Sequence, residues 1–339
     1  MAAGAAAVTA VLTSDLCRVR PIAEPVPAAL VGTPAGEIFR RLVRMNDGDA
    51  HGTMKPAVSA TLGSLDIAHL AGVSRQRAHA LVTAMTPQHA PDRITDFAFR
   101  LTAEVVATLL GAFPDALPAI VGWTEDFVRG IAPGATPDQV ARGASAAAHL
   151  LDLSRAMRSG DGLVAELDGH ARGDTDGAVA NAIGFLSQAY DATAGLIGNT
   201  LVALARYPDL RRAVPAVVLE VLRHDPPVQN TRRFVARDGD VAGVPMKAGD
   251  AMLVVLAAAN RDPAVNPDPA QFDVAREDPA IFTFGVGGHA CPGAMVATTI
   301  AAAGVQELLT SGLALDGLLE TVRYRPSPNA RIPLFGASP

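Results

Sequence analysis

The most informative stretch of the chain is Phe284-Gly285-Val286-Gly287-Gly288-His289-Ala290-Cys291-Pro292-Gly293. Its glycines allow the backbone to turn tightly and to approach a flat or bulky group closely. An apolar helix is predicted directly after it, over residues 292–310. The positive end of that helix favours a thiolate over a thiol at Cys291. The stretch therefore predicts a thiolate ligand on a tight loop, which is what cysteine-ligated haem requires.

Two other interpretations fit parts of this stretch. Gly285-x-Gly287-x-x-Ala290 matches a loose dinucleotide fingerprint, which needs a preceding strand and a surrounding βαβ unit. No alternating strand–helix pattern surrounds it in the sequence. A buried structural cysteine in a turn would require neither Phe284 nor His289.

Length and composition indicate a folded protein. The 339 residues are 49% hydrophobic and 18% charged, so the chain can bury a large core. The net charge of -6 argues against nucleic acid as a partner. The two cysteines, Cys17 and Cys291, cannot form a disulfide framework, which favours a cytoplasmic location, although a single bridge between them would consume the ligand. No stretch is long and apolar enough to predict a membrane span or a signal peptide.

The chain is predicted to be mainly α with a minor β part. Apolar periodicity between Pro and Gly breaks predicts helices over 36–45, 51–62, 75–86, 95–110, 117–129, 136–157, 178–205, 209–222 and 292–310. Strands are predicted late in the chain, over 228–237, 241–245, 251–257 and 321–334. We expect one domain over 1–339, helix-rich over 1–225, mixed β and loop over 226–290, and a helix followed by β structure over 291–339.

The pattern Phe-Gly-x-Gly-x-His-x-Cys-x-Gly resembles the haem-binding loop of the cytochrome P450 superfamily, in its soluble bacterial class. The resemblance implies the cytochrome P450 fold, with heme b between the helices that the family names I and L. It implies Cys291 as the iron ligand, with further haem contacts from Phe284, Gly285, His289 and Gly293. It also implies an oxidoreductase of the monooxygenase type, which takes electrons from a ferredoxin and a ferredoxin reductase.

The resemblance extends to the segment that precedes the loop. Glu220 and Arg223 match the family's Glu-x-x-Arg helix, which is thought to brace the proximal face of the haem. Without that context, such a pair is usually a solvated surface pair of little value. The family commonly has an Arg before Phe272, where this chain has Gln271, and Arg276 is a candidate substitute for it.

The haem propionates are assigned partners by the same resemblance. His51 and Lys55 match a His and a basic residue one turn apart on the family's C helix. Arg233 and His289 match the other two propionate partners, and buried carboxylates need such donors. His51 by itself would be interpreted as an ordinary surface histidine.

The range 178–205 resembles the I helix, whose acid–Thr pair manages protons on the oxygen side of the haem. Asp191 falls at the acid and Ala192 at the usual Thr. Thr193 follows, but one residue is a rotation of about 100° around the helix. We therefore predict catalytic positions at Asp191, Ala192 and Thr193, with an atypical proton relay. Predicted substrate contacts, which could equally face the interior or solvent, are Gln188, Ala189, Val228, Asn230 and Thr231.

Three further features depart from the usual pattern. Pro292 has no N–H, which predicts fewer hydrogen bonds to the thiolate and a lower reduction potential, unless it only begins the helix. Residues 7–12 resemble the B helix, with almost nothing ahead of it, which predicts a shortened member and an open sheet edge covered by a homodimer or partner chain. Arg40, Arg41, Arg44 and Lys55 form either a docking patch for an acidic ferredoxin or an ordinary solvated face.

The expected function is a haem-thiolate monooxygenase or oxidase that acts on a small or medium organic substrate, free or carrier-bound, in biosynthetic tailoring. It would use O2 and external electrons. One alternative is an oxidative coupling or cyclisation enzyme without oxygen insertion. Another is an auxiliary subunit that folds like the family but does not turn over. The intact Cys291 loop argues against that last alternative.

Overall fold

The computed structural model describes residues 1–336, which form two compact units built from separate stretches of chain. The first unit contains residues 1–17, 74–101 and the chain from 191 onward. The second unit contains residues 18–73 and 102–190. The single domain expected over 1–339 stays a prediction.

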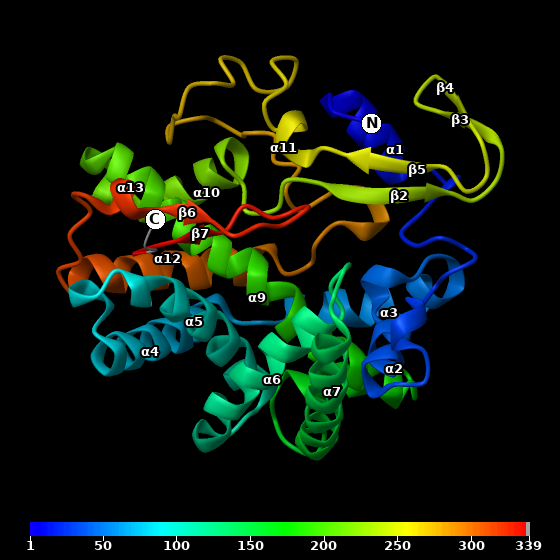
Figure 1. Ribbon diagram of the computed structural model, residues 1–339, viewed down its shortest axis with the longest axis horizontal. Coiled ribbons are helices and arrows are strands. Elements are labelled where there is room, and N and C mark those ends of the chain that lie inside the picture. The colour runs from blue at the N-terminus through cyan, green and yellow to red at the C-terminus, as the bar shows by residue number, and fades with distance from the viewer. Residues whose placement is uncertain (337–339) are drawn as a thin grey trace. The chain divides into compact units, whose positions relative to one another are not determined.

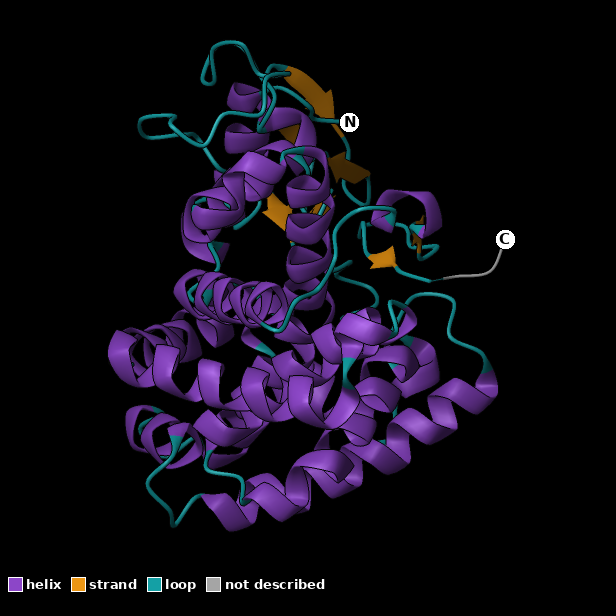
Figure 2. Ribbon diagram, turned by 90° about the vertical axis from the view of Figure 1, so that its left-hand side faces the viewer, coloured by secondary structure: helices purple, strands orange, loops and turns teal. Residues whose placement is uncertain are grey.

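Helices dominate and strands are few and short, as Figure 2 shows, so the predicted mainly α fold with a minor β part is confirmed. The helices of the second unit are α2 (Pro34–Arg41), α3 (Gly48–Gly63), α6 (Leu117–Gly130), α7 (Pro137–Met157) and α8 (Leu163–His170). Those of the first are α1 (Ala5–Thr13), α10 (Val214–His224), α11 (Leu256–Ala259), α12 (Ala294–Thr310) and α13 (Leu318–Thr321). The helices with residues in both units are α4 (Ile67–Met85), α5 (Asp92–Leu110) and α9 (Thr175–Arg206). Among the described residues no helix is both long and apolar enough to cross a membrane.

Local sequence explains the helix pair α6 and α7 of the second unit. Thr136 and Gln139 form a reciprocal capping box that begins α7. The helices then approach so closely that a Cβ on Gly130 would lie 2.8 Å from the Cα of Gly143. Only glycine fits this crossing, so a side chain at Gly130 would push the helices apart.

The polar segment 160–177 was expected to lack a helix, and this expectation was wrong. It contains α8, whose apolar Leu163, Val164 and Leu167 are buried on one side. The spacing of i, i+1 and i+4 is a helical stripe, but it is too short to stand out among the surrounding polar residues.

The sheet of the first unit has the order β1-β2-β5. Strand β2 (Thr231–Val235) runs antiparallel to β5 (Ala251–Val254), with Arg233 opposite Met252, and β1 is Cys17–Arg18. Helix α1 lies beside this sheet in Figure 1, and its Val8, Val11 and Leu12 are buried in a core with Val235 and Val254. Both strands are shorter than predicted, and β5 ends at Val254 because the chain turns into α11 after Val255.

The edge of β5 is partly covered by the start of the chain. The N–H of Ala2 donates to the carbonyl of Leu253 at 2.9 Å, and the N–H of Val255 donates to the carbonyl of Ala2 at 2.8 Å. These bonds satisfy groups that an edge strand would otherwise expose. The open edge that we expected is therefore closed along these residues.

Two hairpins complete the β structure of the first unit. One pairs β3 (Gly239–Val241) with β4 (Val244–Met246). The other pairs β6 (Arg323–Tyr324) with β7 (Pro333–Leu334) near the C-terminus. The predicted strand over 321–334 is thus a hairpin with an irregular connection between two short strands.

Helix α12 is the element that positions the glycine-rich loop, because it begins directly after it. It packs against α10, and its Gly304 lies so close to α5 that a Cβ there would meet the Leu101 side chain at 2.5 Å. This close packing fixes the axis of α12 within the first unit.

Candidate active site

The glycine-rich loop is closed by its own backbone. The N–H of Cys291 donates to the carbonyl of Phe284 at 2.8 Å. Gly285 and Gly287 have φ values of 69° and 73°, a region that side chains disfavour. At Gly287 a Cβ would also lie 2.9 Å from Cγ2 of Thr13 on α1. The sequence therefore uses glycine at the two positions where the turn and the close approach require it.

The structure separates the interpretations of Cys291 that the sequence left open. Within residues 1–336 no strand leads into the loop, so the dinucleotide fingerprint lacks its βαβ unit. Cys291 is exposed and Cys17 is buried, and the two form no disulfide with each other. Pro292 lies two residues before α12, whose N-cap is Gly293. Its expected alternative role as the first residue of the helix is therefore not observed.

These features fit a haem iron held by the thiolate. Cysteine is among the most often buried residue types, yet Cys291 is exposed at the end of a rigid loop. The first turn of α12, which begins three residues later, leaves N–H groups without intrahelical acceptors. Such donors and the helix dipole favour the negative charge that an axial thiolate carries.

Helix α9 carries the three residues predicted for the proton relay, and it shows no local unwinding around them. The helix is α-helical without interruption from Thr175 to Arg206, and most of its residues beyond the first turn are buried. Ala192 is half-buried, whereas Thr193 has no exposed surface. The hydroxyl of Thr193 has no hydrogen-bond partner within residues 1–336. The two side chains thus point in different directions, as the rotation between consecutive helical residues requires.

Asp191 is held by Arg325, a residue that no pattern in the sequence indicated. Its Oδ2 lies 2.5 Å from Nη2 of Arg325, next to β6, and the Arg325 guanidinium lies 5.5 Å from the ring centre of Phe99. The other oxygen, Oδ1, is buried and has no hydrogen-bond partner among the described residues. The carboxylate therefore has one oxygen bound to a cation and one available to a ligand.

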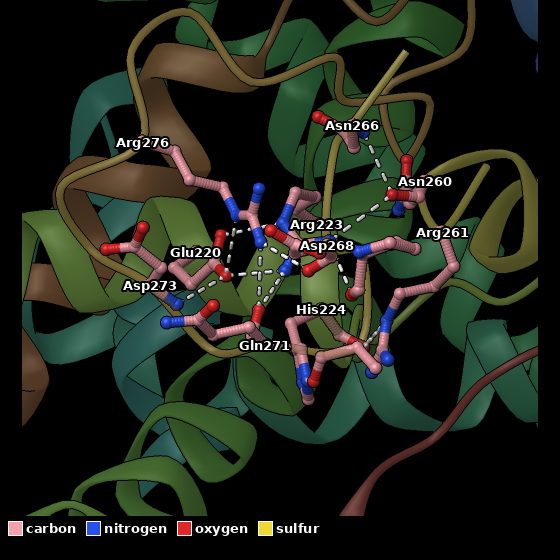
Figure 3. A network of polar contacts seen from close by, with 12 residues as sticks. Glu220, Arg223, His224, Asn260, Arg261, Asn266, Asp268, Gln271, Asp273 and Arg276 are labelled. Atoms are coloured by element: carbon pink, nitrogen blue, oxygen red, sulfur yellow. Dashed lines mark hydrogen bonds and ion pairs between the residues drawn. The ribbon is translucent and has the colours of Figure 1, made fainter. Parts of the chain in front are cut away.

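A buried ion pair lies between α10 and the loop-rich segment that follows α11, as Figure 3 shows. Glu220 and Arg223 form a bidentate pair with distances of 2.6 and 2.8 Å, and the Arg223 side chain is fully buried. Arg223 also donates to the carbonyls of Pro269 and Gln271 at 2.9 and 2.8 Å. The predicted pair is therefore the centre of a scaffold and not a solvated surface pair.

Arg276 takes part in this network. The family commonly has its second arginine at the position of Gln271, five residues earlier. Its Nε lies 3.5 Å from Oε1 of Glu220, and its side chain is 12% exposed. Its Nη atoms donate to the carbonyls of Pro267 and Asp268 at 2.6 and 2.7 Å. Gln271 contributes its backbone carbonyl to Arg223. Arg276 is therefore the substitute that the sequence suggested.

Asn260 connects the scaffold to the glycine-rich loop. Its amide donates to the carbonyl of Leu222 on α10 and to the hydroxyl of Thr283, both at 2.9 Å. Its Oδ1 accepts from the N–H of Phe282 at 2.6 Å. Asn260 was not among the residues predicted from the sequence, because nothing local shows that it reaches Phe282.

The four predicted propionate partners are distributed over both units. Arg233 on β2 is buried, and His289 ends the short 3-10 turn Gly287–His289 of the first unit. His51 and Lys55 lie one turn apart on α3 of the second unit, and both are half-buried. Their roles toward haem stay predictions.

The predicted substrate contacts lie on α9 and around the start of β2. The Asn230 amide donates to the carbonyl of Pro328 at 3.1 Å, and the Gln188 amide donates to the carbonyl of Gly184 at 2.9 Å. Both amides are therefore held by backbone. The other three residues predicted to contact the substrate, Ala189, Val228 and Thr231, are half-buried.

The basic patch predicted in the second unit is largely neutralised. Arg40 and Arg41 both pair with Glu37, at 2.5 and 2.7 Å, and Arg41 also pairs with Asp176 at 3.3 Å. Burial lowers the pKa of Arg44 to about 10, which leaves this side chain protonated at neutral pH. The reduction in positive charge therefore comes from the pairs that Arg40 and Arg41 form with Glu37 and Asp176.

Comparison with known proteins identifies the family. A family model described as Cytochrome P450 matches residues 212–310, which include the ion-pair scaffold and the glycine-rich loop. The chain is 32% identical over 270 residues to the cytochrome P450 monooxygenase PikC of Streptomyces venezuelae, covering 74% of this chain and 64% of PikC.

Two solved structures share the fold. P450BioI, solved with acyl carrier protein that carries hexadec-9Z-enoic acid, matches with a TM-score of 0.84 at 23% identity over 98% of this chain and 90% of that one. A mutant of P450 EryK with erythromycin B matches with a TM-score of 0.75 at 26% identity over 99% and 90%. This chain is therefore a member of the cytochrome P450 family, whose haem iron is held by a cysteine thiolate and whose members are oxidoreductases of the monooxygenase type.

Proposed function

We propose that this chain oxidises a small or medium organic substrate in a biosynthetic pathway, with O2 as oxidant and electrons from a ferredoxin and its reductase. The observation that carries the proposal is the exposed Cys291 on a closed loop, supported by the buried Glu220–Arg223 scaffold. Haem bound there supplies oxygen activation and one-electron chemistry, which side chains cannot perform.

The chain's own residues would hold the cofactor. Cys291 supplies the thiolate, and Phe284, Gly285 and Gly293 shape the loop behind it. Arg233 and His289 of the first unit, with His51 and Lys55 of the second, are proposed to pair with the two propionates. Cationic and hydrogen-bonding donors offset the cost of burying those carboxylates.

The proton relay is proposed to depend on the substrate itself. Asp191 is fixed through Oδ2 by Arg325, and its buried Oδ1 is available to hold or pass a proton. Ala192 has no hydroxyl, and the Thr193 hydroxyl is fully buried. A hydroxyl or amide of the bound substrate would therefore occupy the place of the usual threonine hydroxyl, with ordered water as the link. The substrate is accordingly expected to be polar near its reacting carbon.

The first test is a binding comparison on the haem-loaded protein. Erythromycin B, a polar probe, and hexadec-9Z-enoic acid, an apolar one, are titrated while the haem absorption spectrum is followed, within a wider panel. The proposal predicts that hydroxyl-bearing compounds dominate the hits. A hit list made of hydrocarbons and simple fatty acids would contradict the substrate-completed relay.

The second test measures coupling with the best hit and its deoxy analogue. Wild type should release several-fold more hydrogen peroxide with the deoxy analogue, because one proton-transfer partner is lost. Ala192→Thr should narrow that difference, whereas the control Thr193→Ala should leave it unchanged because that hydroxyl is buried. If Ala192→Thr greatly improves coupling with the hydroxyl-bearing compound itself, the substrate does not complete the relay.

Oxidative coupling or cyclisation without oxygen insertion is the second candidate function. The alanine at position 192 favours it, because one-electron oxidation depends less on controlled proton delivery. Turnover under ¹⁸O-labelled O2 separates the two functions. A monooxygenase product contains labelled oxygen, and a coupling product contains none. A carrier-bound substrate is included in this proposal because P450BioI was solved with a loaded carrier protein.

A further inference from the structure

A hollow in the first unit lies away from the glycine-rich loop. It has a volume of about 390 Å³ and is formed by α4, by the turn η5 (Pro208–Arg212) and by the last turns of α12. Its polar lining consists mainly of Arg75, Arg211, Arg212, Gln306 and Glu307. The α12 residues that line it, Ala303 to Thr310, lie about 14 to 24 Å along the helix axis from Ala294, because a helix rises 1.5 Å per residue. The hollow is therefore distinct from the proposed haem site.

The arginines of this hollow lack the partners that others in the chain have. Within residues 1–336, the side chains of Arg75 and Arg212 form no hydrogen bond or ion pair. Arg211 has only Asp316, a fully exposed carboxylate 4.0 Å away. By contrast, Arg129 lies 2.6 Å from Glu125 and Arg158 lies 2.8 Å from Asp168. In a chain of net charge -6, this concentration of unneutralised positive charge is unusual.

The one carboxylate that lines the hollow does not neutralise it. Oε1 of Glu307 lies 2.8 Å from Nδ1 of His79 and not beside a guanidinium. Like charges that share a concave surface repel each other, and solvent reduces this repulsion between exposed arginines without removing it. A bound anion would remove this cost.

We propose that this hollow binds a small compound with a phosphate group. Guanidinium forks match phosphate oxygens in geometry and charge, and three of them from two separate segments suit a group with several anionic oxygens. The amide of Gln306 adds a neutral donor. The volume is at the lower end of the range for ligand pockets, which limits the compound to the size of pyrophosphate or a small organic phosphate.

Such an anion would tie together segments that are distant in sequence. It would connect α4 with η5 and the end of α12, and α12 packs against α10, which carries Glu220 and Arg223. The site would therefore stabilise the far end of the scaffold that holds the Cys291 loop. It does not depend on which substrate the enzyme oxidises.

Calorimetric titration of the haem-loaded protein with inorganic pyrophosphate tests the proposal, at constant ionic strength set with sodium chloride. We expect saturable binding of one pyrophosphate per chain, with orthophosphate weaker. Arg75→Gln and Arg212→Gln should each weaken binding about tenfold, since each removes a charge-assisted contact. Arg155→Gln is the matched control, because Arg155 is an exposed arginine of α7 that lies 3.6 Å from Asp152.

A melting experiment supplies an independent measurement on the same proteins. Pyrophosphate should raise the melting temperature of wild type and of Arg155→Gln more than that of Arg75→Gln or Arg212→Gln. Both hollow variants should fold, because the replaced side chains are exposed. The proposal is overturned if wild type shows no saturable heat, if the hollow variants bind as wild type does, or if the control loses as much affinity.

Discussion

Arg276 lies with its Nε 3.5 Å from Oε1 of Glu220, so the charged network has a second arginine although Gln271 stands where the family commonly has one. The same Glu220 oxygen lies 2.6 Å from Arg223 and accepts the N–H of Asp273 at 2.9 Å. One buried carboxylate thus organises both helix α10 and the segment after α11. An arginine at position 276 in place of 271 therefore still gives the Glu220 carboxylate a second cationic partner.

Replacement of Arg276 should weaken this scaffold. Arg276→Gln loses the contacts to the carbonyls of Pro267, Asp268 and Gln271 and the ion pair, and should lower the free energy of unfolding by roughly 1–3 kcal/mol. Urea denaturation of the haem-loaded protein measures the loss. Adding Gln271→Arg to that variant should recover about half of it, because contacting sites couple. Full stability of Arg276→Gln would show that the network does not need a second arginine.

Glu220→Gln should be more damaging, because it leaves the fully buried Arg223 guanidinium without its carboxylate. Breaking a buried pair from one side costs about 3–5 kcal/mol. Glu125→Gln is the control, since it breaks the exposed pair with Arg129 and should cost about 0–1 kcal/mol. Equal losses in the two variants would mean that the α10 pair behaves as a surface pair.

Arg325 should control the proton supply through Asp191. Arg325→Gln releases the carboxylate from its cation and should raise the ratio of peroxide to product about tenfold, with a larger solvent isotope effect. Arg323→Gln, an exposed arginine two residues earlier, is the control. An unchanged ratio in Arg325→Gln would assign the ion pair a purely structural role.

The scaffold should lose stability in acid through His224. Burial, and to a lesser extent the charges of Arg261 and Arg223, lowers the pKa of His224 from 6.5, while its hydrogen bond to the carbonyl of Ala270 at 3.0 Å acts in the opposite direction. The unfolded chain therefore takes up the proton at a higher pH than the native state. Stability is fully present above pH 6.5 and is lost as the pH falls below 6.5 toward the native pKa.

Denaturation over a pH series measures this dependence. His224→Gln should flatten the fall in unfolding free energy between about pH 7 and 5. His69→Gln, on the exposed side of α4, should retain the wild-type slope. Identical slopes in all three proteins would exclude His224 as the titrating group.

Local patterns explain what the sequence could predict. The glycine-rich loop, the helix that follows it and the Glu220–Arg223 pair each lie within a few residues, so spacing alone defines them. The rotation between Ala192 and Thr193 is likewise a property of any α-helix, and the burial of Thr193 agrees with it. The role of Arg276 could also be predicted, because Gln271 is neutral at a position where the family commonly has an arginine.

Contacts between residues far apart in the chain could not be predicted from the sequence. Asp191 and Arg325 are 134 residues apart, and no periodicity or motif links them. Asn260 reaches Phe282 and Thr283 only after the intervening loops have folded back. The short helix α8 was missed because its apolar stripe is brief and its neighbours are polar. Tertiary packing, and not local preference, determines each of these features.

We expect a strongly red-shifted Soret band in the ferrous carbon monoxide complex of wild type and of Cys17→Ser, because Cys17 is a buried cysteine away from the loop. Cys291→Ser should lose that shift. A wild-type spectrum without the shift, or a Cys291→Ser spectrum that keeps it, would contradict thiolate ligation of the haem iron by Cys291.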